Sequence, residues 1–155
     1  MDPLDSAPPA PVYGGFWRRV AAYMLDELVM LIIIVVLAVI VVVPTVILVT
    51  MLGRELDSEK YASLLSTLIT IPVIWLYPTL LESSKLQATL GKRALGMRVT
   101  DEHGNRVSFG RANGRFWSKA LSSLVLGAGY LMVAFSQRKQ GLHDRIAHTL
   151  VVRTR

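Results

Sequence analysis

The chain contains no cysteine among its 155 residues. Disulfide bonds, thiolate catalysis and cysteine-ligated metal sites are therefore excluded, although this absence does not identify the compartment. Charged side chains are also scarce, at 18% of the residues, against roughly a quarter in a typical soluble domain. Hydrophobic residues make up 52%. This balance favours a membrane protein over a soluble domain.

Charge is missing altogether from two long stretches. Residues 28–52 form an uncharged run of 25, and residues 61–81 form a second run of 21. About 20 apolar residues in a helix cross the roughly 30 Å of bilayer hydrocarbon. We therefore predict two transmembrane helices, at about 26–52 and 61–81. A flexible, proline-rich tail is expected over residues 1–13, and the membrane domain over residues 14–153.

Basic residues are distributed unevenly around the two runs. The 53–60 loop carries Arg54 and Lys60 against three acidic residues, whereas residues 82–119 carry eight basic residues against three acidic ones. Cytoplasmic loops are the ones enriched in Lys and Arg. The N-terminus and residues 82–119 are therefore expected in the cytoplasm, and the short loop outside.

A third uncharged stretch, residues 120–135, has only 16 residues and contains Gly127 and Gly129. A full crossing would place the basic residues that follow it outside, against the positive-inside rule. We therefore predict a helical hairpin over about 111–136 that dips into the membrane and returns, with its turn at Gly127–Gly129. A third complete span is the alternative.

The segment between the second run and this hairpin has the pattern of strands. β-Branched residues flank a turn-rich pentapeptide, which predicts a β-hairpin over residues 96–109, and residues 148–153 are a further strand candidate. The expected fold is an α-helical membrane protein with two spans, a re-entrant or third membrane segment and a small cytoplasmic β-hairpin.

Polar residues at the entry to the first span are candidate functional groups. Arg19, Tyr23 and Asp26 are spaced four and three apart, so they share one helical face. A carboxylate inside a span costs about 2.5–3.5 kcal/mol on insertion scales, so Asp26 needs a partner or water. Either the helix lies along the interface before residue 26, which leaves Asp26 shallow, or the span starts early and breaks at Pro44.

The first half of the predicted hairpin is amphipathic. Arg111, Arg115 and Lys119 recur at helical spacing on one face, and aromatic residues lie beside them. Such a face suits anionic lipid at the cytoplasmic interface, so these three are candidate lipid-interface residues. An ordinary helix packed on its own protein is the alternative. Beside membrane spans, lipid explains this pattern more simply than nucleic acid.

No catalytic or metal-binding pattern is complete. Gly91-Lys92-Arg93 lacks the following Ser or Thr and the upstream glycine of a phosphate loop. His143, Asp144 and His148 do not have the spacing of metal ligands. The sequence therefore predicts neither an enzyme nor a bound metal or cofactor.

Three blocks of the sequence resemble the RDD family of small bacterial membrane proteins, named for one Arg and two Asp. They are GFWRRVAAY at residues 15–23 with Asp26, TLGKRALGMRV at residues 89–99, and a closing segment that contains QGLHD at residues 140–144 and TLVV at residues 149–152. The resemblance implies that Arg19, Asp26 and Asp144 take the three named positions. It also implies a multi-pass protein of the bacterial inner membrane with a role in transport, ions being one candidate cargo.

Two functions stay open from the sequence. In the first, the chain is a transporter subunit that exchanges a cation for a proton at Asp26, with Arg19 tuning the pKa of this carboxyl and Asp144 gating from the cytoplasm. Two spans cannot enclose a path, so the subunit would form a homo-oligomer or join a partner membrane protein. In the second, the chain is a non-transporting assembly or accessory factor, and the same three residues form a structural charge network.

Overall fold

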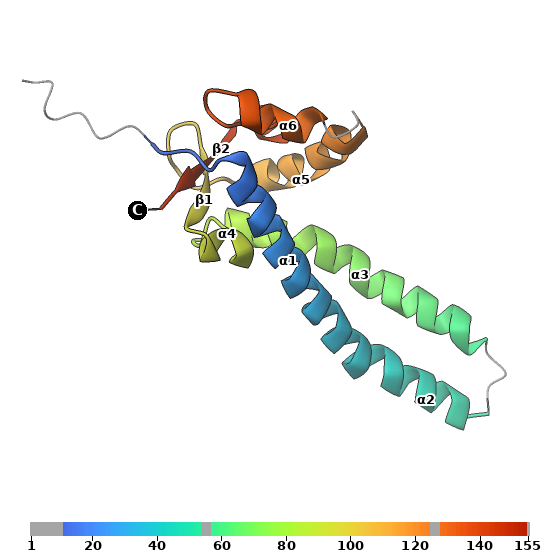
Figure 1. The fold of residues 1–155 in the computed structure, drawn as a ribbon. Helices are drawn as coiled ribbons and strands as arrows, with labels where there is room; N and C mark the ends of the chain where they lie inside the picture. Colours follow the sequence, from blue (N-terminus) through green and yellow to red (C-terminus); the bar gives the residue numbers. More distant parts are fainter. Residues whose placement is uncertain (1–10, 54–56, 125–127, 155) are drawn as a thin grey trace, which may run out of the picture.

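Two long helices form an antiparallel hairpin, and every other element packs at one end of it (Figure 1). The computed structural model describes residues 11–53, 57–124 and 128–154. The first long helix comprises α1 (Phe16–Leu37), the π-helical η2 (Ala38–Val42) and α2 (Val43–Met51). The second is α3 (Ser58–Ser83). Within the described part of the chain, Phe16–Met51 and Glu59–Ser83 are long and apolar enough to cross a membrane.

The first long helix runs through Pro44 without a break. Proline lacks an N–H and its ring crowds the preceding turn of an α-helix. The wider π-helical turn at Ala38–Val42 lies directly before Pro44 and accommodates the ring. The Thr45 hydroxyl donates to the carbonyl of Val41 at 2.6 Å. The break predicted at Pro44 in one of the two alternatives is therefore wrong, since the helix is continuous from Phe16 to Met51.

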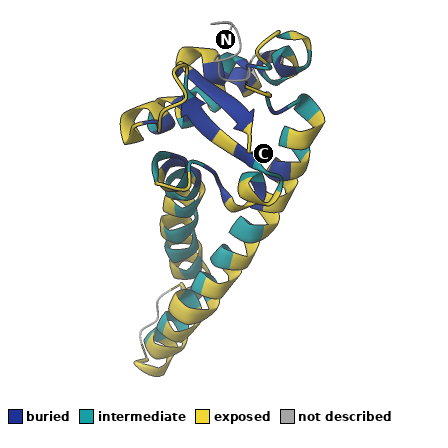
Figure 2. Cartoon of the chain, turned by 90° about the vertical axis from the view of Figure 1, so that its left-hand side faces the viewer, coloured by how far each residue is buried: buried dark blue, intermediate teal, exposed yellow. Residues whose placement is uncertain are grey.

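The remaining elements form a polar domain at one end of the hairpin, which we call the head. It contains α4 (Leu90–Ala94), β1 (Met97–Asp101), α5 (Phe109–Leu124), α6 (Ala128–Phe135), α7 (Leu142–Ile146) and β2 (Thr149–Arg153). The burial pattern differs sharply between the two parts: the strands are buried, whereas the long helices are largely exposed (Figure 2). The buried apolar side chains of the core are Ala22, Met97, Val99, Val107, Ala112 and Val151.

The small sheet differs from the predicted β-hairpin. β1 pairs antiparallel with the C-terminal β2, in the register Val99↔Val151. Within residues 96–109 themselves, the only β pairing is an isolated bridge between Thr100 and Arg106. On its other edge, β2 receives Tyr13, which bridges to Val152. The fold therefore begins before the predicted boundary at residue 14, and the sheet joins the two ends of the chain rather than neighbouring segments.

α6 folds back along α5 as a helical hairpin. The hydroxyl of Tyr130 donates to the carbonyl of Lys119 at 3.1 Å. A Cβ on Gly129 would lie 2.8 Å from the Cβ of Ser122, so glycine is what allows this close approach. The turn predicted at Gly127–Gly129 begins outside the described residues. α5 has 16 residues and α6 has 8, which makes them about 24 Å and 12 Å long, each too short to cross a bilayer.

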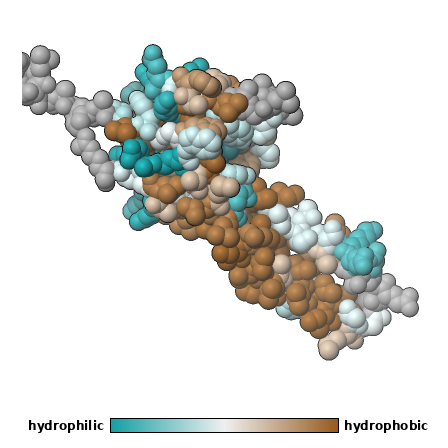
Figure 3. All heavy atoms as spheres, in the orientation of Figure 1, coloured by the Kyte–Doolittle hydropathy of each residue, from teal (hydrophilic) through white to brown (hydrophobic). Residues whose placement is uncertain are grey.

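Hydropathy divides the molecule along its length. An apolar surface covers the long helices, whereas hydrophilic residues gather on the head and at the far tip of the hairpin (Figure 3). This distribution matches a bilayer around the helical hairpin, because hydrocarbon replaces water along the apolar band.

Candidate functional site

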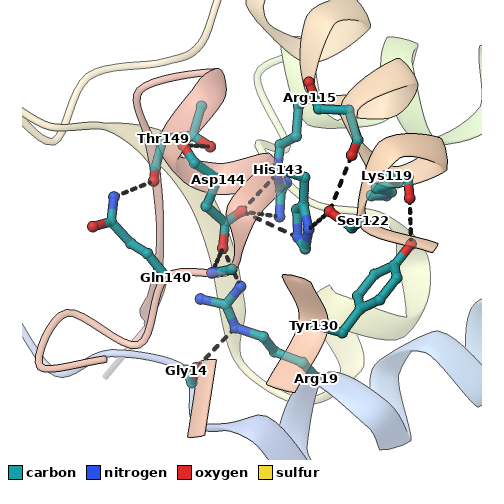
Figure 4. Close-up of polar contacts among 12 residues, drawn as sticks. Gly14, Arg19, Arg115, Lys119, Ser122, Tyr130, Gln140, His143, Asp144 and Thr149 are labelled. Atoms are coloured by element: carbon teal, nitrogen blue, oxygen red, sulfur yellow. Dashed lines mark hydrogen bonds and ion pairs between the residues drawn. The ribbon is translucent and has the colours of Figure 1, made fainter. Parts of the chain in front are cut away.

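Five charged side chains form a buried network where the head meets the long helices. They come from five different helices, which they tie together: Arg19 (α1), Glu82 (α3), Lys92 (α4), Arg115 (α5) and Asp144 (α7). We refer to these residues as the charge network. Figure 4 shows its Asp144 side, with Arg19 and Arg115 approaching the carboxylate from two directions.

Asp144 lies in the first turn of α7 and is completely buried. Its carboxylate accepts from the guanidinium of Arg19 at 2.5 Å, from Arg115 Nε at 2.9 Å and from the Gly141 N–H at 3.1 Å. Burial opposes ionisation, but the charges of Arg115 and Arg19 outweigh it and hold the pKa of the Asp144 carboxyl well below its usual value. Asp144 is therefore an ionised anchor for two guanidinium groups.

Arg115 joins the two carboxylates of the network. Its guanidinium contacts Asp144 at 2.8 Å and Glu82 at 2.7 Å, and only 2% of the side chain is exposed. Burial lowers the pKa of Arg115, but Glu82 and Asp144 raise it further than burial lowers it. Lys92 supplies a second cation to Glu82. The position of Arg115 corrects the predicted lipid-interface role, because this side chain faces protein and not lipid.

The other two predicted lipid-interface residues lie elsewhere on α5. The Arg111 side chain is 51% exposed and lies 3.7 Å from Asp101. Lys119 is partly buried, one turn after Arg115. The amphipathic pattern of α5 thus identifies one helical face correctly. On this face the Arg111 side chain is exposed to solvent, whereas the Arg115 side chain is buried in the protein.

Arg19 also fixes two loops by hydrogen bonds to backbone. Its Nε donates to the carbonyl of Gly14 at 2.9 Å, and its second terminal nitrogen donates to the carbonyl of Lys139 at 2.5 Å. One guanidinium therefore holds the N-terminal segment, the α6–α7 connection and α7 together.

Asp26 has a separate set of partners. Its carboxylate accepts from the hydroxyl of Thr89 at 2.5 Å, from the N–H of Gly91 at 2.7 Å and from the hydroxyl of Tyr77 at 2.9 Å. Only 6% of Asp26 is exposed. The three donors come from α3 and from the start of α4, so Asp26 docks both elements on α1.

Position 91 must be glycine because α4 packs very closely against α1 at this point. A Cβ there would lie 2.2 Å from the carbonyl oxygen of Ala22 and 2.9 Å from Cγ of Asp26. Only the absence of a side chain lets the N–H of Gly91 reach the carboxylate.

The structure thus divides the residues predicted from the sequence. It brings Arg19 and Asp144 together, and it places Asp26 in a different hydrogen-bonded group. Tyr23 is 63% exposed and lies on the outer side of α1. Sequence reasoning missed the joint role of Glu82 and Arg115, whose only signal was that both are charged residues close to predicted membrane segments.

Ser122, His143 and Asp144 lie in a row, but not as a reactive centre. Ser122 Oγ is 3.5 Å from His143 Nδ1, and His143 Nε2 is 3.5 Å from Asp144 Oδ1. Ser122 is completely buried and its hydroxyl donates to the carbonyl of Ser118 at 3.0 Å. Burial lowers the pKa of His143 to about 3, so the ring is neutral at pH 7. The three side chains are therefore enclosed by protein and bring α5 close to α7.

Comparisons with known proteins agree on one family. The sequence model of the RDD family matches residues 13–148. The uncharacterized protein YxaI of Bacillus subtilis is 38% identical over 145 residues, which cover 89% of this chain and 95% of YxaI. The uncharacterized membrane protein YteJ of the same organism is 33% identical over 150 residues, which cover 90% of this chain and 80% of YteJ. No solved structure matches.

Proposed function

Because the chain belongs to the RDD family of membrane proteins, we propose that it is a non-transporting membrane assembly or accessory protein. Its two-helix hairpin anchors the chain in the bilayer, and its head presents a fixed surface at the membrane. The charge network and the Asp26 contacts then serve to lock the head on its anchor.

The engagement of the buried carboxylates Asp26, Glu82 and Asp144 supports the structural role. Asp26 accepts three hydrogen bonds from the chain itself, and each would have to rearrange if the carboxylate were to take up and release a proton or a cation. Arg19, which the transport hypothesis assigned to tuning Asp26, bonds to Asp144 instead. The donors around Asp26 favour a permanent joint over an exchange site.

We propose the inner membrane of a bacterium as the location, with the head and the N-terminus in the cytoplasm. The excess of Lys and Arg over residues 82–119 and the acidic balance of the 53–60 loop support this orientation. The bridge between Tyr13 and Val152 supports a common side of the membrane for the N-terminal segment and the C-terminal strand. The α5–α6 hairpin belongs to the same side, at the lipid interface.

The partners that fit the anchor are lipids and other membrane helices. The outer surface of α1 is apolar and exposed over several turns, with Leu28, Leu31, Ile32 and Val35 each more than half exposed. A homo-oligomer or a partner membrane protein could cover this surface. Packing between helices in a bilayer relies on close van der Waals contact rather than on hydrophobic burial.

Measuring proton-coupled cation flux tests the proposal directly. The purified chain is placed in liposomes that contain a pH-sensitive dye, and gradients of Na⁺, K⁺ and Li⁺ are applied in turn. We expect the same rates as in protein-free liposomes, both for the wild type and for Asp26→Asn. We also expect Asp26→Asn to lower the unfolding temperature, because an amide holds the hydroxyl and N–H donors less strongly than a carboxylate.

Any exchange above the protein-free rate would overturn the non-transporting role. Glu59→Gln is the matched control, since Glu59 is an exposed carboxylate in the first turn of α3. Exchange that persists in Glu59→Gln and disappears in a folded Asp26→Asn would establish Asp26 as the exchange site.

A further inference from the structure

Positive charge is in excess where α3, α4 and α5 meet. The charge network contains three cationic side chains and two carboxylates, and Lys119 adds a fourth cation on the face of α5 that carries Arg115. His143 contributes no charge at pH 7, since burial lowers its pKa to about 3. Asp26, which accepts from the N–H of Gly91 next to Lys92, is a third carboxylate in this region. Four cations thus face three carboxylates, which leaves one positive charge without a counterion.

Lys119 is the cation that lacks a partner. Among the residues that the structure describes, no carboxylate lies within ion-pair distance of its ammonium group, whereas Lys92 and Arg115 each pair with Glu82. Burial lowers the pKa of Lys119 to about 8. The negative charge of Glu82 raises this pKa, and the positive charges of Lys92 and Arg115 lower it. An ammonium group in these surroundings is stabilised by any anion that reaches it.

Contacts between α5 and α3 place Arg115, one turn before Lys119, beside the last turn of α3. The indole N–H of Trp75 donates to the side-chain oxygen of Asn113 at 2.7 Å, and Glu82 pairs with Arg115. Trp75 lies eight residues before Ser83, the last residue of the second candidate span, which is about 12 Å along the helix. α5 therefore crosses α3 over its last turns, where a membrane helix leaves the hydrocarbon and enters the headgroup region.

The outer side of α5 is apolar at this level. Trp117 is 59% exposed and Leu121 is 47% exposed, and they lie four residues apart on the same side of the helix. Tryptophan is enriched at membrane interfaces, where its ring suits the boundary between headgroups and hydrocarbon. Lys119 lies two residues from each of them, so it points to the opposite side of α5, the side that carries Arg115 and faces Glu82.

We propose that Lys92 and Lys119 bind the phosphate of an anionic phospholipid where α3, α4 and α5 meet. Basic pockets between membrane helices at the cytoplasmic side are suited to anionic headgroups. Lys92 lies beside Glu82, and its side chain stays 12% exposed. The lipid, rather than free phosphate, is the ligand because the site lies at the end of a candidate span whose outer surface is apolar. The site does not depend on whether the protein transports ions.

Lipid-dependent unfolding of the full chain tests the site. The protein is purified in a neutral detergent and titrated with phosphatidylglycerol or with phosphatidylcholine of the same acyl chains, while thermal unfolding is followed by tryptophan fluorescence. Native mass spectrometry counts the bound lipids. We expect phosphatidylglycerol alone to raise the unfolding temperature and to remain bound at one molecule per chain.

Lys119→Gln is the decisive variant, because Lys119 forms no ion pair whose loss would disturb the fold. We expect its affinity for phosphatidylglycerol to fall about tenfold, the effect of roughly 1.4 kcal/mol, and Lys119→Arg to restore it.

Lys85→Gln is the control, since Lys85 is exposed in the connection between α3 and α4. Equal responses to the two lipids, or unchanged binding by Lys119→Gln, would overturn the proposal. Equal stabilisation by inorganic phosphate would assign the site to a free anion instead.

Discussion

Arg19 and Asp144, 125 positions apart in the chain, form an ion pair of 2.5 Å that joins the first membrane helix to the last helix of the head. Arg115 binds the same carboxylate from α5 and continues the contact to Glu82 at the end of α3. A carboxylate buried with two guanidinium groups is stable only while its partners stay in place. The charge network is therefore a joint that holds five helices in one arrangement.

Arg115→Met is expected to be the most damaging substitution in the network. It leaves Glu82 and Asp144 buried with one cation fewer each, and breaking a buried pair typically costs about 3–5 kcal/mol. Chemical unfolding of the purified protein in detergent micelles measures this loss. Arg111→Met serves as control, because the Arg111 side chain is 51% exposed and surface substitutions usually change stability by less than about 0.5 kcal/mol. Equal effects of the two variants would contradict a structural role of the network.

Gly91→Ala is expected to prevent α4 from docking on α1. The added Cβ would lie 2.2 Å from the carbonyl oxygen of Ala22, and overpacking of this kind costs about 1–3 kcal/mol or more. Gly114→Ala is the matched control, since a Cβ at Gly114 meets nothing within 4 Å and alanine in a helix is about 0.5–1 kcal/mol better than glycine. The two substitutions should therefore shift the unfolding temperature in opposite directions, and a shift in the same direction would refute the packing argument.

The elements that depend on local sequence could be predicted, and the contacts between distant segments could not. Both candidate spans follow from uncharged runs, because hydropathy acts along a continuous helix. Helical spacing placed Arg111, Arg115 and Lys119 on one face of α5, but it does not say whether that face meets lipid or protein. Arg115 faces Glu82 and Asp144, so its lipid-interface assignment was wrong for a reason that lies outside α5.

Strand pairing shows the same limit. A turn-rich pentapeptide between β-branched residues predicted a local hairpin, yet β1 pairs with β2 near the C-terminus. Residues 148–153 were recognised as a strand candidate, but nothing local ranks them above residues 106–109 as the partner of β1. Likewise, the sequence predicts that Asp26 needs hydrogen-bond partners, but it does not identify them. Thr89 and Gly91 become its donors only when α4 packs on α1.

Thr89→Val is expected to weaken the joint between α1 and α4 without a change in side-chain shape. The hydroxyl of Thr89 donates to Asp26 at 2.5 Å in a buried position, and a hydrogen bond to a charged group contributes about 1.5–3 kcal/mol. Thr67→Val is the control, because the hydroxyl of Thr67 is exposed and donates only to Ser63 in its own helix. Chemical unfolding should separate the two variants by at least about 1 kcal/mol. If they unfold alike, Asp26 does not rely on Thr89.

Acid is expected to destabilise the fold through His143 before any carboxyl group titrates. The pKa of His143 falls from 6.5 to about 3 on folding, mainly because the ring is buried. Between these two values the unfolded chain binds a proton that the folded chain does not, so the free energy of unfolding falls as the pH falls, by at most about 1.4 kcal/mol per pH unit. Asp144, whose pKa is lowered by Arg115 and Arg19 despite its burial, adds a further loss only when the pH approaches the ordinary value of 3.8. Glu82, whose pKa is held below its ordinary value of 4.5 by Arg115 and Lys92 despite its burial, adds its own loss as the pH approaches 4.5. Unfolding measured between pH 7 and about pH 5.5 therefore reports mainly on the histidine.

His143→Gln should flatten this pH dependence, because the amide fills the position without titrating. His103→Gln should leave the dependence as in the wild type, since His103 is exposed in the turn after β1. A slope that survives in His143→Gln would show that a different group takes up the proton. A slope that is lost in both variants would point to a change in the unfolded chain, where the two histidines are alike.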